Sequence, residues 1–455
     1  MAMKLFGTDG IRGEANIWPI SVDGATRTGQ ALAQLLKKNQ TGEIHVLIGK
    51  DTRESGTMLE QALTASLISE GIHVHCLGVA PTPAVAYLTA KHQFIAGIML
   101  TASHNPFQDN GIKIFAENGY KLSASDEEFL ESVILADRDA TKQIADSSNP
   151  IILGSFSNAA VMVEDYSSFV KASLKPSALA GMKLVIDAAN GASFEIAQSI
   201  FSDLGAEVIA LNTEPNGRNI NLNCGALYPE ATAKVVLEQA ADIGICFDGD
   251  TDRVIFIDEK GEVVPGDNVL ALCAIALKKE EKLAQDTLVV TVMSNLGTRD
   301  CLAEHGIEMV ATAVGDKHVV QAMREGNFSL GGENSGHIIF AENATTGDGI
   351  MSALMLLSIL KKEQKPLSDL ASCLTPYPSL LSAIKVKDKP ALESVPEIYE
   401  SMQSAENLLG DQGRILVRYS GTEKKIRVLV EAKDADLAQQ CSKTICTAIH
   451  NTIAL

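Results

Sequence analysis

A serine at the end of an apolar run is the first candidate for chemistry in this sequence. The run from Ile95 to Leu100 changes abruptly into the small polar stretch Thr101-Ala102-Ser103-His104-Asn105-Pro106. A buried strand that ends in this way presents the Ser103 hydroxyl at a turn, which is where α/β enzymes place reactive groups. A strand followed by an Asn-Pro turn with a capping serine fits the same residues, so this stretch alone leaves both interpretations open.

Three aspartates at alternate positions follow a second apolar run. Asp248, Asp250 and Asp252 come directly after the strand-like segment IGICF. Hard cations such as Mg²⁺ and Ca²⁺ need several oxygen ligands, and a tight loop with a glycine can turn alternate carboxylates inward. An acidic hairpin turn is the alternative, but three adjacent carboxylates repel one another without a cation. The loop is not an EF-hand, because no glycine stands at its sixth position.

Three more loops carry polar groups. Near the C-terminus, two guanidinium groups, two hydroxyls and a glycine suit a phosphate, although a polar hairpin would use the same residues. These residues are Arg418, Ser420, Gly421, Thr422 and Arg427. The segment from Gly331 to His337 surrounds donors and acceptors with glycines and could bind sugar hydroxyls or an amine; a lone histidine such as His337 is more often structural. The N-terminal Gly-rich segment with Arg12 is a weak signal by itself.

The elements that must position these loops repeat three times. Each repeat reads as strand, helix, Gly-led strand, helix and strand, and its third strand ends in one of the loops. The repeats begin at the strands 44–49, 183–192 and 287–295, and their third strands lead to Ser103, to Asp248–Arg253 and to Glu333–His337. Alternating β and α elements predict α/β domains with largely parallel sheets, in which ligands gather beyond the carboxyl ends of the strands. Three such domains could direct three loops into one cleft.

After Pro366 the pattern changes to short apolar strands and a final helix from about Asp434 to His450, which indicates a smaller α+β domain joined by a linker. The predicted fold is therefore three similar α/β domains with mixed, largely parallel sheets around a cleft, plus this C-terminal domain. The predicted boundaries are 1–152, 153–256, 257–370 and 371–455.

The composition and net charge of the chain exclude several classes of protein. The chain has 455 residues, 46% of them hydrophobic, and its longest apolar stretch is too short to span a bilayer. The N-terminus lacks the features of a secretory signal, so we expect a cytoplasmic protein. The eight cysteines are scattered without metal-like spacing and are expected to be buried small hydrophobes. A formal net charge of −19 argues against nucleic acid but allows a small anionic ligand in a local basic pocket.

Taken together, the loops resemble the α-D-phosphohexomutase superfamily over the whole length of the chain. The motifs occur in that family's order: FGTDGIRG, the Ser-His-Asn-Pro loop with DNGIKIF, EPNGRNIN, DGDTDR, VGDKHV, ENSGH, TTGDGI and RYSGTE. Each motif is modest, but the combination is specific. The resemblance implies a four-domain enzyme that interconverts glucosamine 6-phosphate and glucosamine 1-phosphate through a 1,6-bisphosphate, on the way to cell-wall amino sugars.

The resemblance also assigns roles to residues of this sequence. Ser103 would carry the phosphoryl group and, with Asp248, Asp250 and Asp252, would hold one Mg²⁺ ion. Arg12, Lys113, His104 and Arg253 would line the reacting centre. Glu333, Asn334, Ser335 and His337 would contact the sugar, and the C-terminal residues Arg418, Ser420, Gly421, Thr422 and Arg427 would bind the phosphate that does not react.

Two departures from the family pattern affect geometry. Thr251 replaces a glycine between two expected metal ligands, and Lys424 follows SGTE where proline is usual. The expected partner is a small phosphosugar, with no nucleic acid and no membrane, and a homodimer is compatible with the sequence. A phosphomannomutase or phosphoglucomutase of the same superfamily is the nearest alternative function. A non-catalytic sugar-phosphate-binding protein is an alternative from another class, against which the retained serine, aspartates and arginines argue.

Overall fold

The computed structural model of this chain describes residues 5–7, 9–39, 42–136, 152–420 and 424–455. The chain forms two compact units. The first comprises Met1–Val292 and Val310–Ala371, and the second comprises Met293–Met309 and Ser372–Leu455.

The three predicted repeats are present, each in the order strand, helix, strand, helix, strand. The first repeat consists of β3 (His45–Lys50), α2 (Gly56–Ser69), β4 (His73–Val79), α3 (Thr82–Lys91) and β5 (Ala96–Leu100). The second consists of β8 (Lys183–Asp187), α7 (Ile196–Asp203), β9 (Glu207–Leu211), α8 (Glu230–Gln239) and β10 (Ile243–Phe247). The third consists of β13 (Thr287–Thr291), α10 (Leu296–Glu304), β14 (Glu308–Thr312), α11 (Asp316–Gly326) and β15 (Leu330–Gly332).

All three sheets share one strand order. The first strand of each repeat lies between the second and the third, and the third strand is followed in the sheet by an antiparallel strand. These antiparallel strands are β6 (Asp109–Ala116), β11 (Val254–Ile257) and β16 (Ile338–Phe340). The predicted fold class of mixed, largely parallel sheets is thus confirmed. The shared antiparallel strand is a part of the repeat that the sequence analysis did not identify.

The third strands are continuous apolar runs because both of their faces are covered. Every residue of β5 and of β10 is buried, as expected for central strands with helices on both sides of the sheet. The polar loops begin where these runs end. The strand β5 ends at Leu100, three residues before Ser103, rather than at Ser103 itself.

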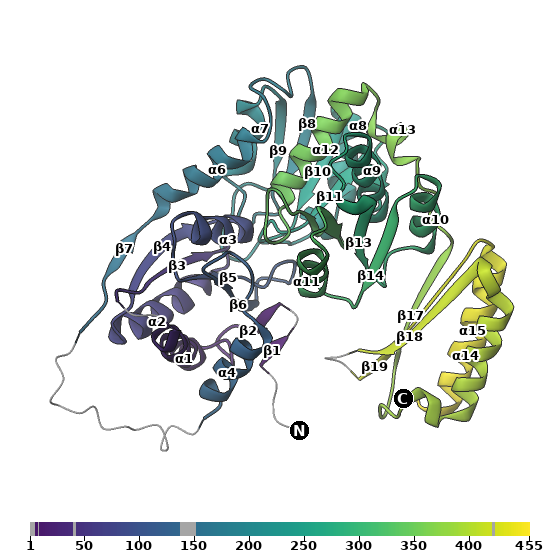
Figure 1. Cartoon of the computed structure of the whole chain (residues 1–455), viewed down its shortest axis with the longest axis horizontal. Helices are drawn as coiled ribbons and strands as arrows, with labels where there is room; N and C mark the ends of the chain where they lie inside the picture. Colours follow the sequence, from purple (N-terminus) through teal and green to yellow (C-terminus); the bar gives the residue numbers. More distant parts are fainter. Residues whose placement is uncertain (1–4, 8, 40–41, 137–151, 421–423) are drawn as a thin grey trace. The chain divides into compact units, whose positions relative to one another are not determined.

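The first sheet is extended at both edges. Two short strands, β1 (Phe6–Gly7) and β2 (Gly10–Glu14), continue it beyond β6, and β7 (Phe156–Asn158) pairs in parallel with β4 at the outer edge (Figure 1). The helices α1 (Val22–Asn39) and α4 (Ala124–Ile134) pack against each other and contribute to the main apolar core of this part of the chain.

The rest of the first unit is largely helical. Besides short 3-10 turns, the other described elements of this unit are α6 (Val163–Ala172), β12 (Val263–Val264), α9 (Gly266–Lys279), α12 (Gly349–Glu363) and α13 (Leu367–Ala371). The facing helices α9 and α12 are buried along most of their length. Among the described residues, no helix is both long and apolar enough to cross a membrane. Six of the eight cysteines are buried and two are half-buried, and no disulfide joins any of them in the described part of the chain.

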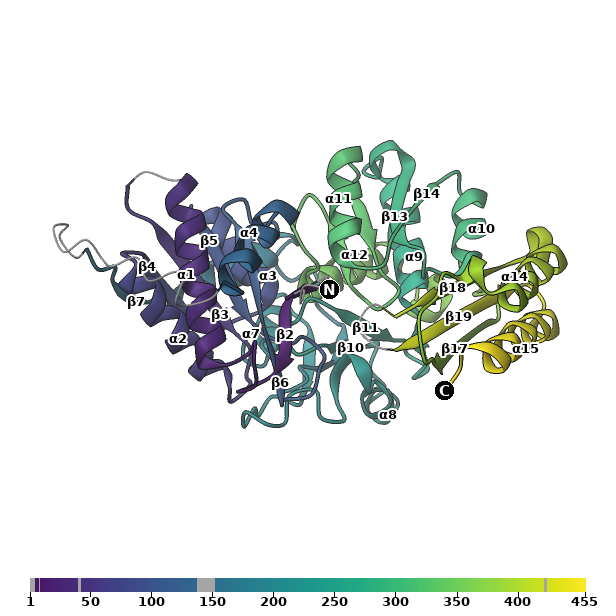
Figure 2. The same cartoon turned by 90° about the horizontal axis from the view of Figure 1, so that it is seen from below.

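The second unit contains the C-terminal α+β fold that the sequence predicts. Its strands β17 (Ser379–Lys385), β18 (Gly413–Tyr419) and β19 (Lys425–Ala432) form an antiparallel sheet with β19 in the centre. The helices α14 (Pro396–Leu409) and α15 (Ala435–Thr452) pack together against this sheet (Figure 2). The apolar side chains of β19, such as Val428 and Val430, are buried beneath them.

Candidate active site

Ser103 occupies a strained turn just beyond β5. Its φ of +53° lies in the left-handed region, and its side chain is fully buried. A non-glycine residue in this conformation costs roughly 1–3 kcal/mol and persists only where surrounding contacts enforce it. The Ser103 backbone N–H donates to Thr101 Oγ1 at 2.8 Å, and the Ser103 hydroxyl donates to Asp248 Oδ2 at 2.7 Å. The turn therefore directs the serine hydroxyl at the aspartate loop of the second repeat.

Arg53, which the sequence analysis did not identify, holds this turn from behind. Its guanidinium pairs with Asp51 at 2.8 Å, and both side chains are fully buried. The same guanidinium donates to the carbonyl oxygens of Ser103 at 2.9 Å and Asn105 at 2.8 Å, and Asn221 Nδ2 also donates to both. Burial raises the pKa of Asp51, against the opposing effect of Arg53. The sequence did contain a signal for Arg53. Asp51-Thr52-Arg53 directly follows the apolar strand β3, just as the Ser103 loop follows β5, so charged residues at this position could have been expected near Ser103.

The three aspartates lie close together in the loop that follows the carboxyl end of β10. Asp248, Asp250 and Asp252 are buried, and one carboxylate oxygen of each lies within 4.8 Å of the others. Asp250 Oδ1 and Asp252 Oδ1 are buried without a hydrogen-bond partner among the described residues. Buried carboxylate oxygens that converge in this way and lack donors fit a hard divalent cation such as Mg²⁺. The cluster can therefore hold a metal ion.

The environments of these aspartates differ electrostatically. Burial, together with the charges of Asp252 and Asp250, raises the pKa of Asp248 well above its ordinary value. Burial also acts to raise the pKa of Asp252, but Lys113 and His337 outweigh it and hold that pKa well below its ordinary value. A cation bound between the carboxylates would remove the repulsion that acts on Asp248.

Two positions in the aspartate loop explain its geometry. A Cβ at Gly249 would lie 2.6 Å from the Ser103 carbonyl oxygen, so only glycine allows the two loops to approach this closely. Thr251 has a φ of +65°, a conformation that glycine adopts without strain. Its side chain is nevertheless accommodated in the interior, and the aspartates on both sides still converge. The threonine therefore does not separate the expected ligands.

Lys113 is the counter-ion of this cluster. It is 1% exposed, and its ammonium group lies 2.8 Å from Asp250, 2.9 Å from Asp252 and 3.0 Å from Asp9. Burial acts to lower the pKa of Lys113, but these three carboxylates raise it well above its ordinary value. Lys121 extends the network by pairing with Asp9 at 2.5 Å. Neither Asp9 nor Lys121 was identified from the sequence, although Asp9 lies in the Gly-rich segment that contains Arg12.

The remaining cations surround His104. Arg12 pairs with Asp9, and Arg253 Nη1 donates to His104 Nδ1 at 3.1 Å. Burial and the charges of Arg253 and Arg12 lower the pKa of His104 to about 4. His104 is thus neutral at physiological pH, and its Nδ1, which accepts from Arg253, lies 3.3 Å from Ser103 Oγ. Burial opposes the charge of Arg253, but the neighbouring carboxylates, Asp252 foremost, raise its pKa above its ordinary value.

The loop of the third repeat joins the same network through His337. This ring is 2% exposed; Nδ1 lies 3.8 Å from Asp252 Oδ1, and Nε2 accepts from the Gly347 backbone N–H at 3.0 Å. Burial acts to lower the pKa of His337, but Asp252 and the neighbouring carboxylates raise it. Glu333 is buried and accepts from the Gly315 N–H at 3.2 Å.

The residues next to Glu333 are more accessible. Asn334 is exposed and Ser335 is half-buried. The first unit thus brings the serine, aspartate and third-repeat loops together.

The predicted phosphate loop lies in the second unit. Arg418 on β18 and Arg427 on β19 stand directly opposite each other in the strand register. Burial and the charge of Arg427 lower the pKa of Arg418. Like charges directly opposite on adjacent strands are unfavourable unless an anion lies near them. Ser420 is buried, whereas the predicted residues Gly421 and Thr422 lie outside the described residues.

Comparison with known proteins defines the class to which this fold and site belong. Four segments match the phosphoglucomutase/phosphomannomutase family: residues 3–141 its α/β/α domain I, 164–261 domain II, 265–377 domain III and 381–448 its C-terminal domain. A solved phosphoglucomutase/phosphomannomutase family protein from Burkholderia thailandensis has the same fold, with a TM-score of 0.81, 22% identity and full coverage of both chains.

Relatives with higher sequence identity identify a more specific family. Phosphoglucosamine mutase of Syntrophotalea carbinolica is 44% identical, with 98% of each chain covered. The Chlamydia abortus protein of the same name is 43% identical over 99% of this chain and 98% of its own length. This chain therefore belongs to the phosphoglucosamine mutase family, within the wider phosphoglucomutase/phosphomannomutase group. The resemblance inferred from the motifs is confirmed.

Proposed function

We propose that this protein is an isomerase that interconverts glucosamine 6-phosphate and glucosamine 1-phosphate, with Ser103 as the phosphoryl carrier. The observation that carries the proposal is the contact of Ser103 Oγ with Asp248 at 2.7 Å, inside a cluster of three buried aspartates and the buried Lys113. Phosphoryl transfer needs positioning and charge neutralisation more than covalent chemistry from the protein. This cluster supplies both at one serine hydroxyl.

The comparisons support the substrate class. The relatives with 43–45% identity over nearly the full chain are named phosphoglucosamine mutases. A solved N-acetylphosphoglucosamine mutase from Aspergillus fumigatus, in complex with GlcNAc-6P and magnesium, has a TM-score of 0.68 at 20% identity and covers 98% of this chain and 95% of its own. Its ligands belong to that protein, and the same kinds of ligand are proposed here because the aspartate cluster fits a hard cation.

The reaction is a pair of phosphoryl transfers. In the first, the bond between phosphorus and Ser103 Oγ breaks while a bond forms to the free hydroxyl oxygen of the sugar phosphate. The proton of that hydroxyl ends on Ser103 Oγ, and the sugar becomes a 1,6-bisphosphate. After the bisphosphate has turned around, the reverse transfer returns its other phosphoryl group to Ser103. Lys113, Arg12 and Arg253 provide positive charge to the three equatorial phosphoryl oxygens.

Asp248, Asp250 and Asp252, with the phosphorylated Ser103, would hold one Mg²⁺ ion. When bound, this ion supplies charge neutralisation at the transferring phosphoryl group. Its fit rests on the convergence of the three carboxylates and on two buried oxygens, Asp250 Oδ1 and Asp252 Oδ1, that accept no hydrogen bond from the described residues. His104, held neutral by its surroundings, orients the Arg253 guanidinium through the 3.1 Å hydrogen bond.

The substrate's other groups are assigned to the two remaining loops. Glu333, Asn334, Ser335 and His337 would contact the sugar, with the Glu333 carboxylate as a partner for the amine. Arg418, Ser420 and Arg427, with Gly421 and Thr422, would bind the phosphate that is not transferred. The four-domain division at 152, 256 and 370, the cytoplasmic location and a homodimer remain predictions from the sequence.

The carrier role is tested by intact-mass analysis and activity of Ser103→Ala. Wild-type protein should carry an increment of about 80 Da, one phosphate group, that is absent from Ser103→Ala. Ser123→Ala is the matched control, because Ser123 is an exposed helix cap. Full mutase activity in Ser103→Ala would show that the serine assignment is wrong.

Substrate choice is tested separately with wild-type protein. Turnover of glucosamine 6-phosphate, glucose 1-phosphate and mannose 1-phosphate should be compared in parallel under one buffer and one Mg²⁺ concentration. The amino sugar should give the highest kcat/KM. A higher value for mannose or glucose phosphate would favour the other mutase functions of the family, and no turnover of any of them would favour a binding protein.

A further inference from the structure

A group of histidines lies at the amino ends of two strands of the first sheet, and the serine loop lies at the carboxyl end. His45 begins β3 and His73 begins β4, and the two residues are register partners in the parallel pair. Residues two apart on a strand share a face, so His75 lies on the face of His73, and Glu43, two residues before His45, continues the same row. Ser103 follows the carboxyl end of the sheet, whereas these residues lie at the amino ends of its strands.

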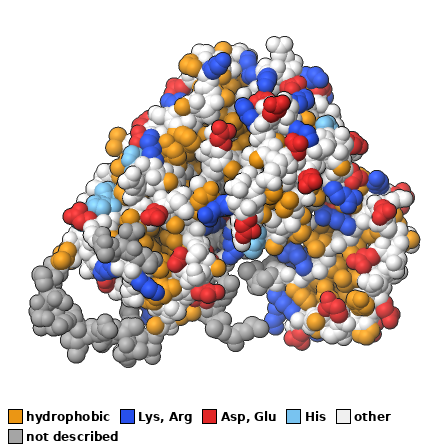
Figure 3. Space-filling model, in the orientation of Figure 1, with side chains coloured by type: hydrophobic (Ala, Val, Ile, Leu, Met, Phe, Trp, Pro, Cys, Tyr) orange, Lys and Arg blue, Asp and Glu red, His pale blue; other side chains and the backbone are white. Residues whose placement is uncertain are grey.

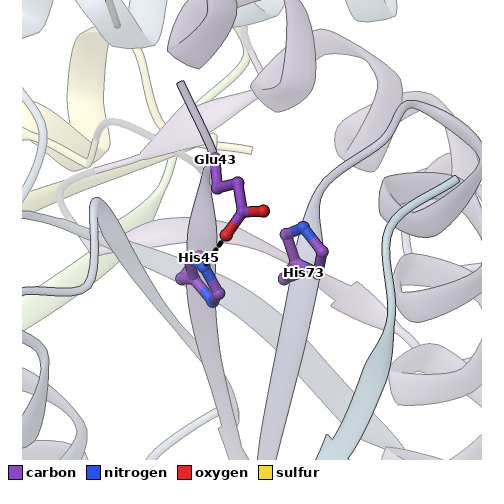
Figure 4. A group of neighbouring side chains, drawn as sticks. All are labelled: Glu43, His45 and His73. Carbon is purple, nitrogen blue, oxygen red and sulfur yellow. Dashed lines mark ion pairs between the residues drawn. The ribbon is translucent and has the colours of Figure 1, made fainter. Parts of the chain in front are cut away.

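The side chains of this group face one another closely. The rings of His45 and His73 stack with centroids 4.7 Å apart, and the Glu43 carboxylate lies 3.6 Å from His45 Nε2. Figure 4 shows the carboxylate directed toward the two rings. One ligand-type atom of each of these three residues lies within 4.8 Å of the others. Solvent reaches the group, because Glu43 is exposed and His45 and His73 are half-buried; Figure 3 shows histidine side chains on this face of the molecule.

The other ring nitrogens are already engaged. His45 Nδ1 lies 3.0 Å from His75 Nε2, and His75 Nδ1 lies 2.7 Å from Ser157 Oγ. His73 Nδ1 lies 2.8 Å from Ser155 Oγ. These contacts leave the Nε2 atoms of His45 and His73 as the nitrogens that face Glu43. Histidines that bind metals are oriented in this way, because the second ring nitrogen donates to a fixed neighbour and sets the tautomer.

We propose that Glu43, His45 and His73 form a surface site for a divalent transition-metal ion of the Zn²⁺ type. Two imidazoles and one carboxylate are a ligand set that Zn²⁺ accepts in tetrahedral geometry, with water in the fourth position. Bonds of about 2.0–2.2 Å in that geometry separate neighbouring ligand atoms by roughly 3.4 Å. The observed 3.6 Å between Glu43 and His45 is close to this separation. Glu43 can adjust, because its side chain is 80% exposed.

The site differs in chemistry from the aspartate cluster. Nitrogen ligands favour Zn²⁺, Co²⁺, Ni²⁺ and Cu²⁺, whereas a cluster of carboxylates alone suits Mg²⁺. An ion here would join β3 to β4 and, through the hydrogen bonds of the histidines with Ser155 and Ser157, would connect both strands to β7 and the residue before it. Its role would be to strengthen this edge of the sheet, and the mutase reaction does not require it.

The test is a titration of the full-length protein with Zn²⁺, followed by calorimetry, in a large excess of Mg²⁺ that occupies the aspartate cluster. Co²⁺ provides a second readout, because its visible absorption distinguishes a tetrahedral site with nitrogen ligands from an octahedral oxygen site. The variants are His45→Ala, His73→Ala and Ser155→Ala. His450→Gln is the matched control, because His450 lies in an exposed position in the last turn of α15.

Wild-type protein and His450→Gln should bind one ion with tetrahedral Co²⁺ absorption. His45→Ala and His73→Ala should lose that binding, and Ser155→Ala should weaken it about 10-fold, the usual effect of removing the neighbour of a ligating histidine. All variants should keep wild-type mutase activity with Mg²⁺, which verifies their fold. The proposal is overturned if wild-type protein shows no such binding, or if both histidine variants bind the ion as tightly as wild type; in either case the three rings are only a stacked, hydrogen-bonded group.

Discussion

The protein's own side chains balance part of the charge around Ser103. Lys113 contacts three carboxylates at 2.8–3.0 Å and is itself buried. A buried ammonium without partners would be strongly unfavourable, and so would the buried carboxylates of Asp250 and Asp252. Each therefore requires the other. Lys113 contacts Oδ2 of Asp250 and of Asp252. The other oxygens of these two carboxylates are the ones available to a cation.

The role of the aspartate loop can be tested with Asp250→Asn. The change keeps the shape and an acceptor for Thr82 and Lys113, but it removes one negative charge from the cation site. Metal-ion charge stabilisation contributes several kcal/mol, so kcat should fall at least about 100-fold. Asp258→Asn is the control, because Asp258 Oδ1 only accepts from two backbone N–H groups in the next turn. Steady-state kinetics over a Mg²⁺ series provide the measurement, and wild-type activity in Asp250→Asn, or activity that persists in EDTA, would contradict the metal role.

Arg53 is expected to control the position of the serine without touching the substrate. Arg53→Met breaks a fully buried ion pair and removes the donors to the carbonyls of Ser103 and Asn105, which should destabilise the fold by about 3–5 kcal/mol. Arg53→Lys keeps the charge but offers fewer directed donors, so it should fold and still lose most of its kcat with little change in KM. Arg218→Ala, which breaks the exposed pair with Glu54, should behave as wild type. Chemical denaturation measures the stability of these variants, and steady-state kinetics measure their kcat and KM. An Arg53→Lys enzyme with normal kcat would show that the turn does not depend on this side chain.

At the scale of elements, the sequence predicts the strands and helices well because their apolar patterns are local. The three repeats, and the loops that end their third strands, follow from continuous apolar runs such as Ile243–Phe247. The shared antiparallel strand was missed as a repeat because β16 has only three residues and β15 before it also has only three. Segments this short carry almost no periodic signal.

The helix α12 offers a prediction about pH. Asp348 caps its first turn by accepting from the Met351 N–H, and the Tyr166 hydroxyl donates to both of its carboxylate oxygens. Burial raises the pKa of Asp348 from 3.8 to about 6, despite these hydrogen bonds. The folded protein thus binds this proton more tightly than the unfolded chain. The stabilisation is fully present below about pH 3.8 and is lost as the pH rises through about 6.

The variant Asp348→Asn tests this effect, because asparagine is an equally good cap and does not ionise. Between pH 4 and pH 7, the free energy of unfolding of wild type should fall relative to that of Asp348→Asn by up to about 3 kcal/mol. Ser123→Asn, at the exposed cap of α4, should show a constant difference from wild type over the same range. Urea denaturation at several pH values gives the comparison. A pH-independent difference between wild type and Asp348→Asn would mean that Asp348 has an ordinary pKa in the folded protein.

At the scale of the whole molecule, the sequence predicts which loops the first unit brings together better than it predicts the residues that support those loops. Ser103 and the three aspartates stand out in the sequence because they come just after continuous apolar runs. Asp9, Lys121 and Arg53 do not, since their importance comes from partners far away in the chain, such as Asp316 for Lys121. A contact across about 195 residues leaves no periodic trace in the sequence. The formal net charge does not predict this local cluster of cations either, because a chain with a net charge of −19 still gathers Arg12, Lys113 and Arg253 around one serine.

The second unit provides the last prediction, because its arginines are placed at a cost to its own stability. Arg418 and Arg427 face each other across β18 and β19, and burial with this repulsion lowers the pKa of Arg418. Arg418→Ala should therefore leave the unliganded protein as stable as wild type, or slightly more stable. The same change should raise KM for glucosamine 6-phosphate about 10- to 100-fold, because a charge-assisted contact to phosphate contributes roughly 1.5–3 kcal/mol.

Two further variants separate this contact from general attraction between charges. Lys424→Glu, at an exposed position beside the loop, should raise KM only a few-fold, and the effect should shrink in high salt. Lys443→Ala, on an exposed part of α15, should change nothing. KM and kcat at two ionic strengths, together with thermal unfolding of the unliganded variants, give the answer. An Arg418→Ala enzyme that loses stability while keeping its KM would mean that the guanidinium supports the sheet, and the phosphate that does not react would then have to be bound elsewhere.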